Sequence, residues 1–463
     1  MDEESKFVDE DEDVVYEEAP FHGVCIKAAS KKKLIAICLD FFDNDTTENV
    51  DPFVEVFFLT YHWFMDSEEL ILHFIHLFEG EESEDDTHLH CKIIRAVRHW
   101  MGNHGTDFER REGLLDLVEN LNSQIAAHAK LGECTENLNL YKWKELHVSN
   151  KTNYGSLPVK KNSLQFNLMK GETMADLLLF LSWKNLIQIP IWEWRDYGKS
   201  ANTAKTPYLK DQIVLFNDVS KYCIGMCLNH SEAEKRAQSV HKFVEASRRL
   251  LELHDYNTLL AVIGGLGHSA MSRLRKTRDY LSMEDKLFIK EIHDSLTSDN
   301  NYAKYRHLVE NIDGFIVPIL GVVMKDLVIL ETAVKDHIER NGQKLINFHK
   351  LVQVSKILQH INQACAIHPD ISPREDLLSI FKVALKSRYN EDALYELSLE
   401  REPRKDSLHS TSSVSSRGSL SGDTEFADWV TGKSLFQHIL VSDLHCIVQH
   451  PTFYVSLEIL FCK

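Results

Sequence analysis

Residues 346–385 read INFHKLVQVSKILQHINQACAIHPDISPREDLLSIFKVAL, and this stretch guides the interpretation of the whole chain. It predicts two helices joined by a turn around Pro369. Apolar residues of the first helix recur at three- and four-residue steps, at Leu351, Val354, Leu358 and Ile361. Polar residues repeat with the same steps on the other side, at His349, Gln353, Lys356, His360 and Gln363. The first helix is therefore predicted to bury one face and to present the other.

The second helix of this stretch has a clear start signal in the sequence. Ser372 is predicted to cap it, with Pro373 at the first helical position and Glu375 three residues after the cap. Its body is apolar on nearly every side, so we expect it to be largely buried. Two interpretations remain open. The stretch is either an ordinary antiparallel helix pair with one solvated face, or a hairpin that inserts into a partner.

The composition predicts an all-α protein of two or three domains. The chain has 463 residues, of which 43% are hydrophobic, 26% are charged, 19 are Gly and 10 are Pro. Its net charge of −18 argues against nucleic-acid binding, which requires a basic surface. No run of about 18 apolar residues could span a membrane, and the acidic N-terminus does not resemble a secretory signal. The nine cysteines have no paired spacing, so we expect reduced thiols and a cytoplasmic location.

Changes in composition divide the chain into six parts. Residues 1–22 are predicted to be a disordered tail, because the first twenty residues include ten Asp or Glu and one Lys. A first helical domain is predicted over 23–128, with helices at 31–42, 50–64, 67–78, 88–102 and 109–129. A polar linker over 129–160 leads to a larger helical domain over 161–404, with strongly apolar helices at 240–253, 256–266 and 317–330. A Ser-rich linker over 405–426 precedes an unassigned tail over 427–463.

Motifs for covalent or metal chemistry are incomplete in this sequence. Gly198-Lys199-Ser200 ends like a phosphate-binding loop, but Glu193 stands where the turn requires Gly. Asp43-Asn44-Asp45 begins like a calcium loop, but Glu48 and Val54 stand where Gly and Glu are required. The His and Cys residues near position 90 lack a second ligand pair at a zinc-like spacing. We therefore predict no metal site, no cofactor and no covalent catalysis.

Residues 255–277, DYNTLLAVIGGLGHSAMSRLRKT, closely resemble a signature of Ras-type guanine-nucleotide exchange domains. Three further stretches agree in order and spacing: FIVPILGVVMKDL (315–327), LINFHK (345–350) and YNEDALYELSLEREPR (389–404). The likeness covers about 161–404, and residues 23–128 resemble the N-terminal Ras exchanger motif domain that accompanies it. The residues of these motifs are most similar to those of the Ras guanyl-releasing proteins. We expect this chain to lack the calcium-binding hands and the zinc-bound diacylglycerol module of that family.

The resemblance implies an all-helical catalytic domain that opens a Ras-family GTPase. The hairpin at 346–385 would displace one switch of the GTPase, and an apolar pocket would hold the other. The hairpin residues implied to face the GTPase are His360, Lys356, Gln353, Gln363 and Leu358. The residues implied to bind it elsewhere are Leu259, Leu260, Phe348, Asn347, Pro318, Leu320, Asn257 and Arg273. His360 stands where members of the family usually have Glu.

We therefore expect a guanine-nucleotide exchange factor for Ras, Rap or both. It would act in the cytoplasm, with recruitment to the inner face of the plasma membrane through the GTPase or another partner left open. Two alternatives also remain. One is a GTPase-binding module of the same fold in which His360 marks weakened catalysis, and the other is an unrelated helical scaffold.

Overall fold

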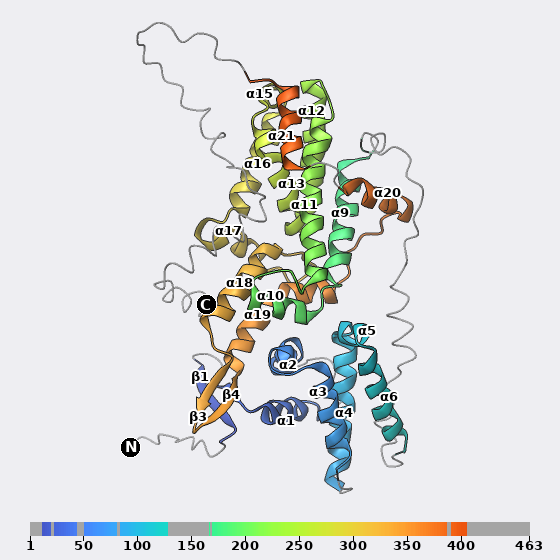
Figure 1. Ribbon diagram of the computed structural model, residues 1–463, viewed down its shortest axis with the longest axis vertical. Helices are drawn as coiled ribbons and strands as arrows, with labels where there is room; N and C mark the ends of the chain where they lie inside the picture. The colour runs from blue at the N-terminus through green and yellow to red at the C-terminus, as the bar shows by residue number, and fades with distance from the viewer. Residues whose placement is uncertain are drawn as a thin grey trace, which may run out of the picture.

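The computed structural model describes residues 12–19, 23–43, 51–80, 84–127, 166, 169–386 and 390–404. Helices form most of this part of the chain, which confirms the predicted all-α class (Figure 1). A smaller group of N-terminal helices lies against one end of a larger helical group. The linkers predicted at 129–160 and 405–426 and the tail at 427–463 lie outside the described residues.

The N-terminal helices form a small core of their own. They are α1 (Lys31–Asp40), α2 (Pro52–Thr60), α3 (Ser67–Phe78), α4 (Glu84–Asn103), α5 (Thr106–Arg110) and α6 (Glu112–Ala127). Ser30, Asp51 and Asp66 cap the first three by accepting a hydrogen bond from a backbone N–H of the first turn. Large side chains bury themselves between these helices, including Phe57, Phe58, Phe74, Trp100 and Phe108. This burial stabilises helices that are too short to persist alone.

The larger group begins at α9 and ends at α21. Its helices are α9 (Gly171–Leu186), α10 (Ile191–Ser200), α11 (Pro207–Leu228), α12 (Ala233–Glu252), α13 (Tyr256–Gly267), α14 (Ser269–Ser272), α15 (Arg275–Asp279), α16 (Met283–Leu296), α17 (Asp299–Val309), α18 (Leu320–Ala333), α19 (Phe348–Ala366), α20 (Glu375–Leu385) and α21 (Glu391–Arg401). The helices α9, α11, α12 and α13 pack on one another at its centre. Gly265 permits the close approach of α13 to α11, because a Cβ atom there would lie 2.8 Å from the Ser220 carbonyl oxygen.

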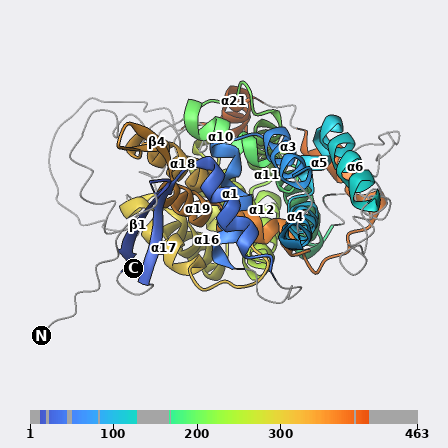
Figure 2. The same cartoon turned by 90° about the horizontal axis from the view of Figure 1, so that it is seen from below.

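A four-stranded antiparallel sheet, which the sequence analysis missed, joins the two groups. Its strands are β1 (Val14–Ala19), β2 (Gly23–Ala29), β3 (His337–Arg340) and β4 (Gln343–Asn347), in the order β1-β2-β4-β3. The sheet lies at the side of the molecule next to the start of α19 (Figure 1, Figure 2). Asn341 and Gly342 connect β3 to β4 with φ angles of 50° and 81°. An Asn-Gly pair is a strong hairpin signal, so the sequence did contain a clue to these two strands.

The prediction of a disordered tail over 1–22 is wrong for residues 14–19. These residues form β1, and its first residue, Val14, is fully buried. The Arg340 guanidinium donates a hydrogen bond of 2.6 Å to the Val14 carbonyl oxygen. The acidic composition hid a short apolar run that pairs with the following strand, β2. The remaining residues of this predicted tail, apart from Glu12 and Asp13, lie outside the described part.

The stretch 346–385 contains two helices, but three details differ from the prediction. The second helix begins at Glu375 with Arg374 as its cap, so Ser372 does not cap it. Only one face of α20 is buried, and Val383 is 37% exposed. The two helices also pack mainly on different neighbours, α19 on α18 and α2, and α20 on α9 and α11. They are therefore not an antiparallel pair packed chiefly on each other.

The described cysteines include both free thiols and one residue in a disulfide bond. Cys25, Cys38, Cys223, Cys227 and Cys365 are free thiols, as their scattered spacing predicts. Cys91 is disulfide-bonded, and the spacing gave no sign of this. Within the described residues, no helix is long and apolar enough to cross a membrane.

Candidate functional site

The start of α19, from Asn347 to Lys350, is held by several hydrogen bonds and is called its root below. The Asn347 side chain caps it by accepting a hydrogen bond from the Lys350 backbone N–H at 3.2 Å. The same side chain donates to the Lys335 carbonyl oxygen at 3.0 Å. Asn347 is nearly buried, so these two bonds occupy it within the chain. The structure gives this predicted binding residue a role in fixing the direction of α19.

Phe348, the first residue of α19, faces the N-terminal helices. Its ring stacks on the ring of Phe53 in α2, with centroids 4.6 Å apart and an interplanar angle of 22°. Only 4% of Phe348 is exposed. Stacked aromatic pairs contribute about 0.5–1.5 kcal/mol beyond the area that they bury. Phe348 is therefore part of the interface that supports α19 and is closed to a partner in this conformation.

An ionic cluster around the buried Lys350 side chain, which the sequence analysis missed, completes the root. The Lys350 ammonium donates to Glu331 at 2.7 Å and to Asp336 at 2.6 Å. The Trp63 indole, from the turn after α2, donates to the other oxygen of Glu331 at 2.6 Å. Burial alone would raise the pKa of Asp336, but the hydrogen bond and charge of Lys350 outweigh this effect and lower the pKa. The cluster joins α18, α19 and the N-terminal helices through charge-assisted hydrogen bonds.

The outward face of α19 carries most of the predicted GTPase-facing residues. Lys356 is exposed, while Gln353 and His360 are half-buried. Burial lowers the pKa of His360 below its ordinary value of 6.5, and no charged neighbour contributes to that shift. The imidazole is consequently neutral at pH 7 and above. The structure brings these three polar side chains to one side of a single helix.

Two of the predicted hairpin residues are placed differently. Leu358 is fully buried on the inner side of α19, so the prediction that it faces a partner is wrong for this conformation. Successive residues of a helix turn by about 100°, which puts Leu358 nearly opposite His360. The Gln363 side chain donates to the Ile312 carbonyl oxygen at 3.2 Å, and none of the described residues forms a hydrogen bond with its own buried oxygen. Gln363 thus connects α19 to the segment before α18.

The residues predicted to form an apolar pocket are core residues in this conformation. Leu259, Leu260, Pro318 and Leu320 are all buried. The Asn257 side-chain oxygen accepts a hydrogen bond from the Leu320 backbone N–H at 3.2 Å, at the start of α18. The two stretches of this group meet through Tyr256 and Val317, whose backbone N–H and C=O bond at 3.0 Å. The structure therefore brings residues 255–260 and 317–320 together, but in the core and not on the surface.

Arg273, the last of the predicted binding residues, holds α21 in place. Its guanidinium donates to the Ser398 carbonyl oxygen at 2.6 Å and to the Glu402 carbonyl oxygen at 2.7 Å. The Glu402 carboxylate in turn forms a buried ion pair with Arg236 at 2.8 Å and accepts from the Thr277 backbone N–H at 3.0 Å. The motif at 273–277 and the 400–404 ending are thus two sides of one internal junction.

Asp255 is a buried acid that the sequence analysis did not single out for its chemistry. One of its oxygens caps α13 by accepting from the Thr258 backbone N–H at 2.9 Å, and the other has no hydrogen-bond partner in the described part of the chain. Burial raises the pKa of Asp255 to about 7. His254, just before it, has a left-handed φ of 56°. No three His, Cys, Asp or Glu side chains come together to hold a metal within the described ranges.

Comparison with known proteins gives two domain matches. Residues 25–121 match the RasGEF N-terminal motif, and residues 173–352 match the RasGEF domain. RAS guanyl-releasing protein 2-B of Xenopus laevis is 30% identical over 382 residues, covering 82% of this chain and 63% of the relative. Ras guanyl-releasing protein 3 of Homo sapiens is 29% identical over 393 residues, covering 83% of this chain and 56% of the relative. The chain thus spans less than two thirds of the length of these relatives, and the matches confirm the resemblance drawn from its sequence.

Proposed function

We propose that this chain, which carries a RasGEF N-terminal motif followed by a RasGEF domain, is a guanine-nucleotide exchange factor for a Ras-family small GTPase. The observation that carries the proposal is the ordered pair of domain matches, at 25–121 and 173–352. The names of the relatives, which describe Ras guanyl-releasing proteins, agree with it. Ras and Rap are the candidate substrates.

In the proposed mechanism, α19 presents its outward face to the nucleotide site of the GTPase. The side chains assigned to this contact are Gln353, Lys356 and His360. A face that enters a phosphate site must not bury an unpaired charge, and two of these three side chains are neutral at pH 7 and above. The root formed by Asn347 and Lys350 would hold the helix against the force of insertion.

The reaction is a coupled binding equilibrium. The exchange factor favours the nucleotide-free GTPase, nucleotide favours the closed GTPase, and each weakens the binding of the other by the same factor. No covalent bond changes in this process, so the protein is a catalyst of release and needs no nucleophile or cofactor of its own. Recruitment to a membrane would come from the GTPase or another partner.

Release of a fluorescent GDP analogue from a panel of Ras and Rap proteins tests the proposal. We expect the full chain to accelerate release from at least one member by tenfold or more over the intrinsic rate. Binding of the nucleotide-free GTPase without acceleration would favour a binding module whose catalysis His360 has weakened. Failure to bind any GTPase of the panel would contradict the proposal. An unrelated helical scaffold would then be the remaining alternative.

A further inference from the structure

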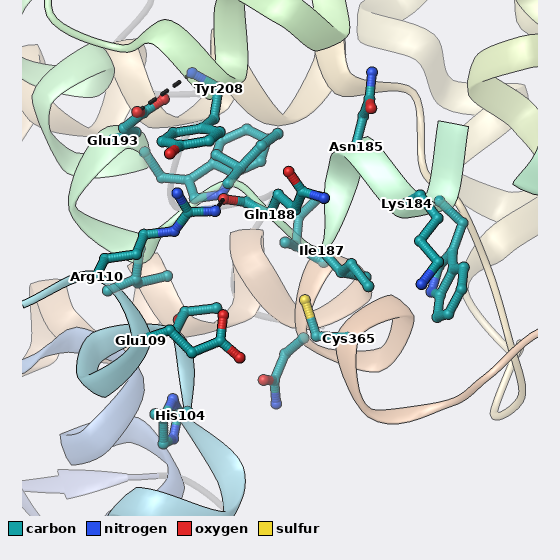
Figure 3. Close-up of a pocket in the computed structure, with 18 of the residues that line it drawn as sticks. His104, Glu109, Arg110, Lys184, Asn185, Ile187, Gln188, Glu193, Tyr208 and Cys365 are labelled. Atoms are coloured by element: carbon teal, nitrogen blue, oxygen red, sulfur yellow. Dashed lines mark hydrogen bonds between the residues drawn. The ribbon is translucent and has the colours of Figure 1, made fainter. Parts of the chain in front are cut away.

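A cavity of about 1130 Å³ lies between the N-terminal helices and the larger helical group (Figure 3). Its walls come from the turn between α4 and α5, the turn between α9 and α10, the start of α11, and parts of α19 and α20. Small-molecule sites are typically concave, measure about 300–1,000 Å³ and often lie at domain boundaries. This cavity is slightly larger and has the same kind of location.

The charged side chains of the cavity favour an anion. Four cations line it and form no salt bridge with a carboxylate of the described residues, namely Arg110, Lys184, Lys205 and Lys382. Two carboxylates also line it. They belong to Glu109 and Glu193. The Glu193 carboxylate accepts hydrogen bonds from the Leu209 and Tyr208 backbone N–H groups, at 2.9 and 3.4 Å, and also attracts Arg110. Four cations therefore face two carboxylates. The local charge is thus positive in a chain whose net charge is −18.

Arg110 is fixed in position with an unused donor. Its guanidinium donates to the Gln188 carbonyl oxygen at 2.8 Å and lies 3.7 Å from the centroid of the Tyr208 ring. Its Nε is buried and, among the described residues, has no hydrogen-bond partner, so an occupant of the cavity would be bound by the other guanidinium N–H groups. Figure 3 shows Arg110 extending from α5 toward Gln188 and Tyr208 of the opposite wall. A buried donor left unpaired costs free energy, and an oriented guanidinium is well suited to phosphate or carboxylate.

Aromatic side chains supply an apolar wall beside these cations. Trp183, Trp192 and Trp194 all line the cavity. The Lys184 ammonium lies 5.4 Å from the centroid of the Trp183 ring, so a charge and an apolar surface adjoin. Trp194 is fully buried behind this wall, and its indole N–H has no hydrogen-bond partner within the described residues. The cavity therefore combines the features that an anionic molecule with an apolar body would use.

The position of the cavity links it to α19. The residues of α19 that line it include Leu358, Ile361, Asn362 and Cys365. At about 100° per residue, these residues lie on the side of the helix opposite His360 and Lys356. An occupant would contact α19 from behind the face assigned to the GTPase, and would touch α5 of the N-terminal helices and α20 at the same time.

We propose that this cavity binds a small anionic molecule that carries a phosphate, sulfonate or carboxylate group on an aromatic or aliphatic body. Arg110 holds the anionic group, Lys184 and Lys382 add positive charge at other points of the wall, and Trp183 and Trp192 contact the body. Because the occupant ties the N-terminal helices to α19 and α20, it changes exchange activity through a coupling free energy. Only this last consequence rests on the proposed function.

Binding is measured on the full chain without any GTPase, so its outcome is separate from that of the exchange assay. The probe is 8-anilinonaphthalene-1-sulfonate, titrated by calorimetry and by quenching of tryptophan fluorescence. We expect one saturable site per chain. Arg110→Gln should weaken binding about tenfold or more, as expected for loss of a hydrogen bond to a charged group. Lys184→Gln should weaken it less, because it removes positive charge from the wall and no direct bond to the anionic group. Lys290→Gln, which removes an exposed lysine of α16 outside the cavity, should bind as the unsubstituted chain does.

A further variant and two competitors complete the test. Lys382 is exposed, so Lys382→Gln should fold even if Arg110→Gln does not, and it should also weaken binding. Displacement of the probe by sodium oleate would support a lipid source for the ligand, and displacement by glycerol 3-phosphate would support a soluble phosphate. Displacement by neither, absence of a saturable site, or cavity variants that all bind like Lys290→Gln would overturn the proposal.

Discussion

Phe53 of α2 and Phe348 of α19 stack with their ring centroids 4.6 Å apart, so the N-terminal helices support α19 at its first residue. Phe348 lies in a core, and Phe348→Ala should lower the free energy of unfolding by about 3–5 kcal/mol. Phe53→Ala should also destabilise, and the double variant should reveal a coupling of about 0.5–1.5 kcal/mol. Urea unfolding of the four proteins measures this. Strictly additive effects would show that the two rings do not stabilise each other. Normal GDP release by a folded Phe348→Ala protein would show that exchange does not depend on this contact.

Removal of the N-terminal helices should lower exchange and thermal stability together. The residues that would lose their partners include Phe348, and also Glu331, which would lose the hydrogen bond from Trp63. Exposure of their apolar contact surface adds to the loss. The comparison is between the full chain and a fragment starting at residue 161, by thermal unfolding and GDP release. A fragment with undiminished melting temperature and activity would contradict this expectation.

Asp255→Asn should make stability less dependent on pH. The pKa of the buried carboxyl is about 7 in the folded chain and about 3.9 when unfolded. Its contribution is therefore fully present below about pH 4 and is lost as the pH rises through 7, by about 4 kcal/mol in total. The Asn side chain retains an oxygen for the Thr258 N–H and has no proton to lose. Denaturant unfolding of both proteins from pH 5 to pH 8 tests this; parallel curves would show that Asp255 does not titrate in this range.

Exchange should depend on pH through His360. The neutral ring can accept a hydrogen bond, and the protonated ring cannot and would repel a lysine of the GTPase. Because burial lowers the pKa of His360, the fall in activity should begin only below about pH 6.5. His360→Glu should remove much of the fall while retaining activity, and His360→Ala should lose the acceptor at every pH. GDP release is measured from pH 7.5 to pH 5.5 with intrinsic release subtracted. Superimposable profiles for the three proteins would assign His360 no part in exchange.

Local sequence signals predicted the helices well, because caps and apolar spacing act within a few residues. The predicted helix at 67–78 coincides with α3, whose start is fixed by the Asp66 cap. The β1–β2 pair escaped notice because β1 is a short strand within an acidic run. The pairing of β2 with β4 could not be predicted either, because β4 lies far along the chain. The contacts of the site residues were harder to predict, because their partners are distant in the sequence. Nothing near Asn257 or Arg273 reveals that their partners are Leu320 and Ser398, 63 and 125 positions away.

The sheet also sets an order of events during synthesis. Val14 and Arg340 bond across 326 positions of the chain, so β1 and β2 are made long before β3 and β4 exist. At a synthesis rate of about 5–20 residues per second, this delay is roughly 15–65 s. During that time the edge of β2 that later pairs with β4 has no partner. The root of α19 can close only when Lys350 has left the ribosome, and the junction between Arg236 and Glu402 forms later still.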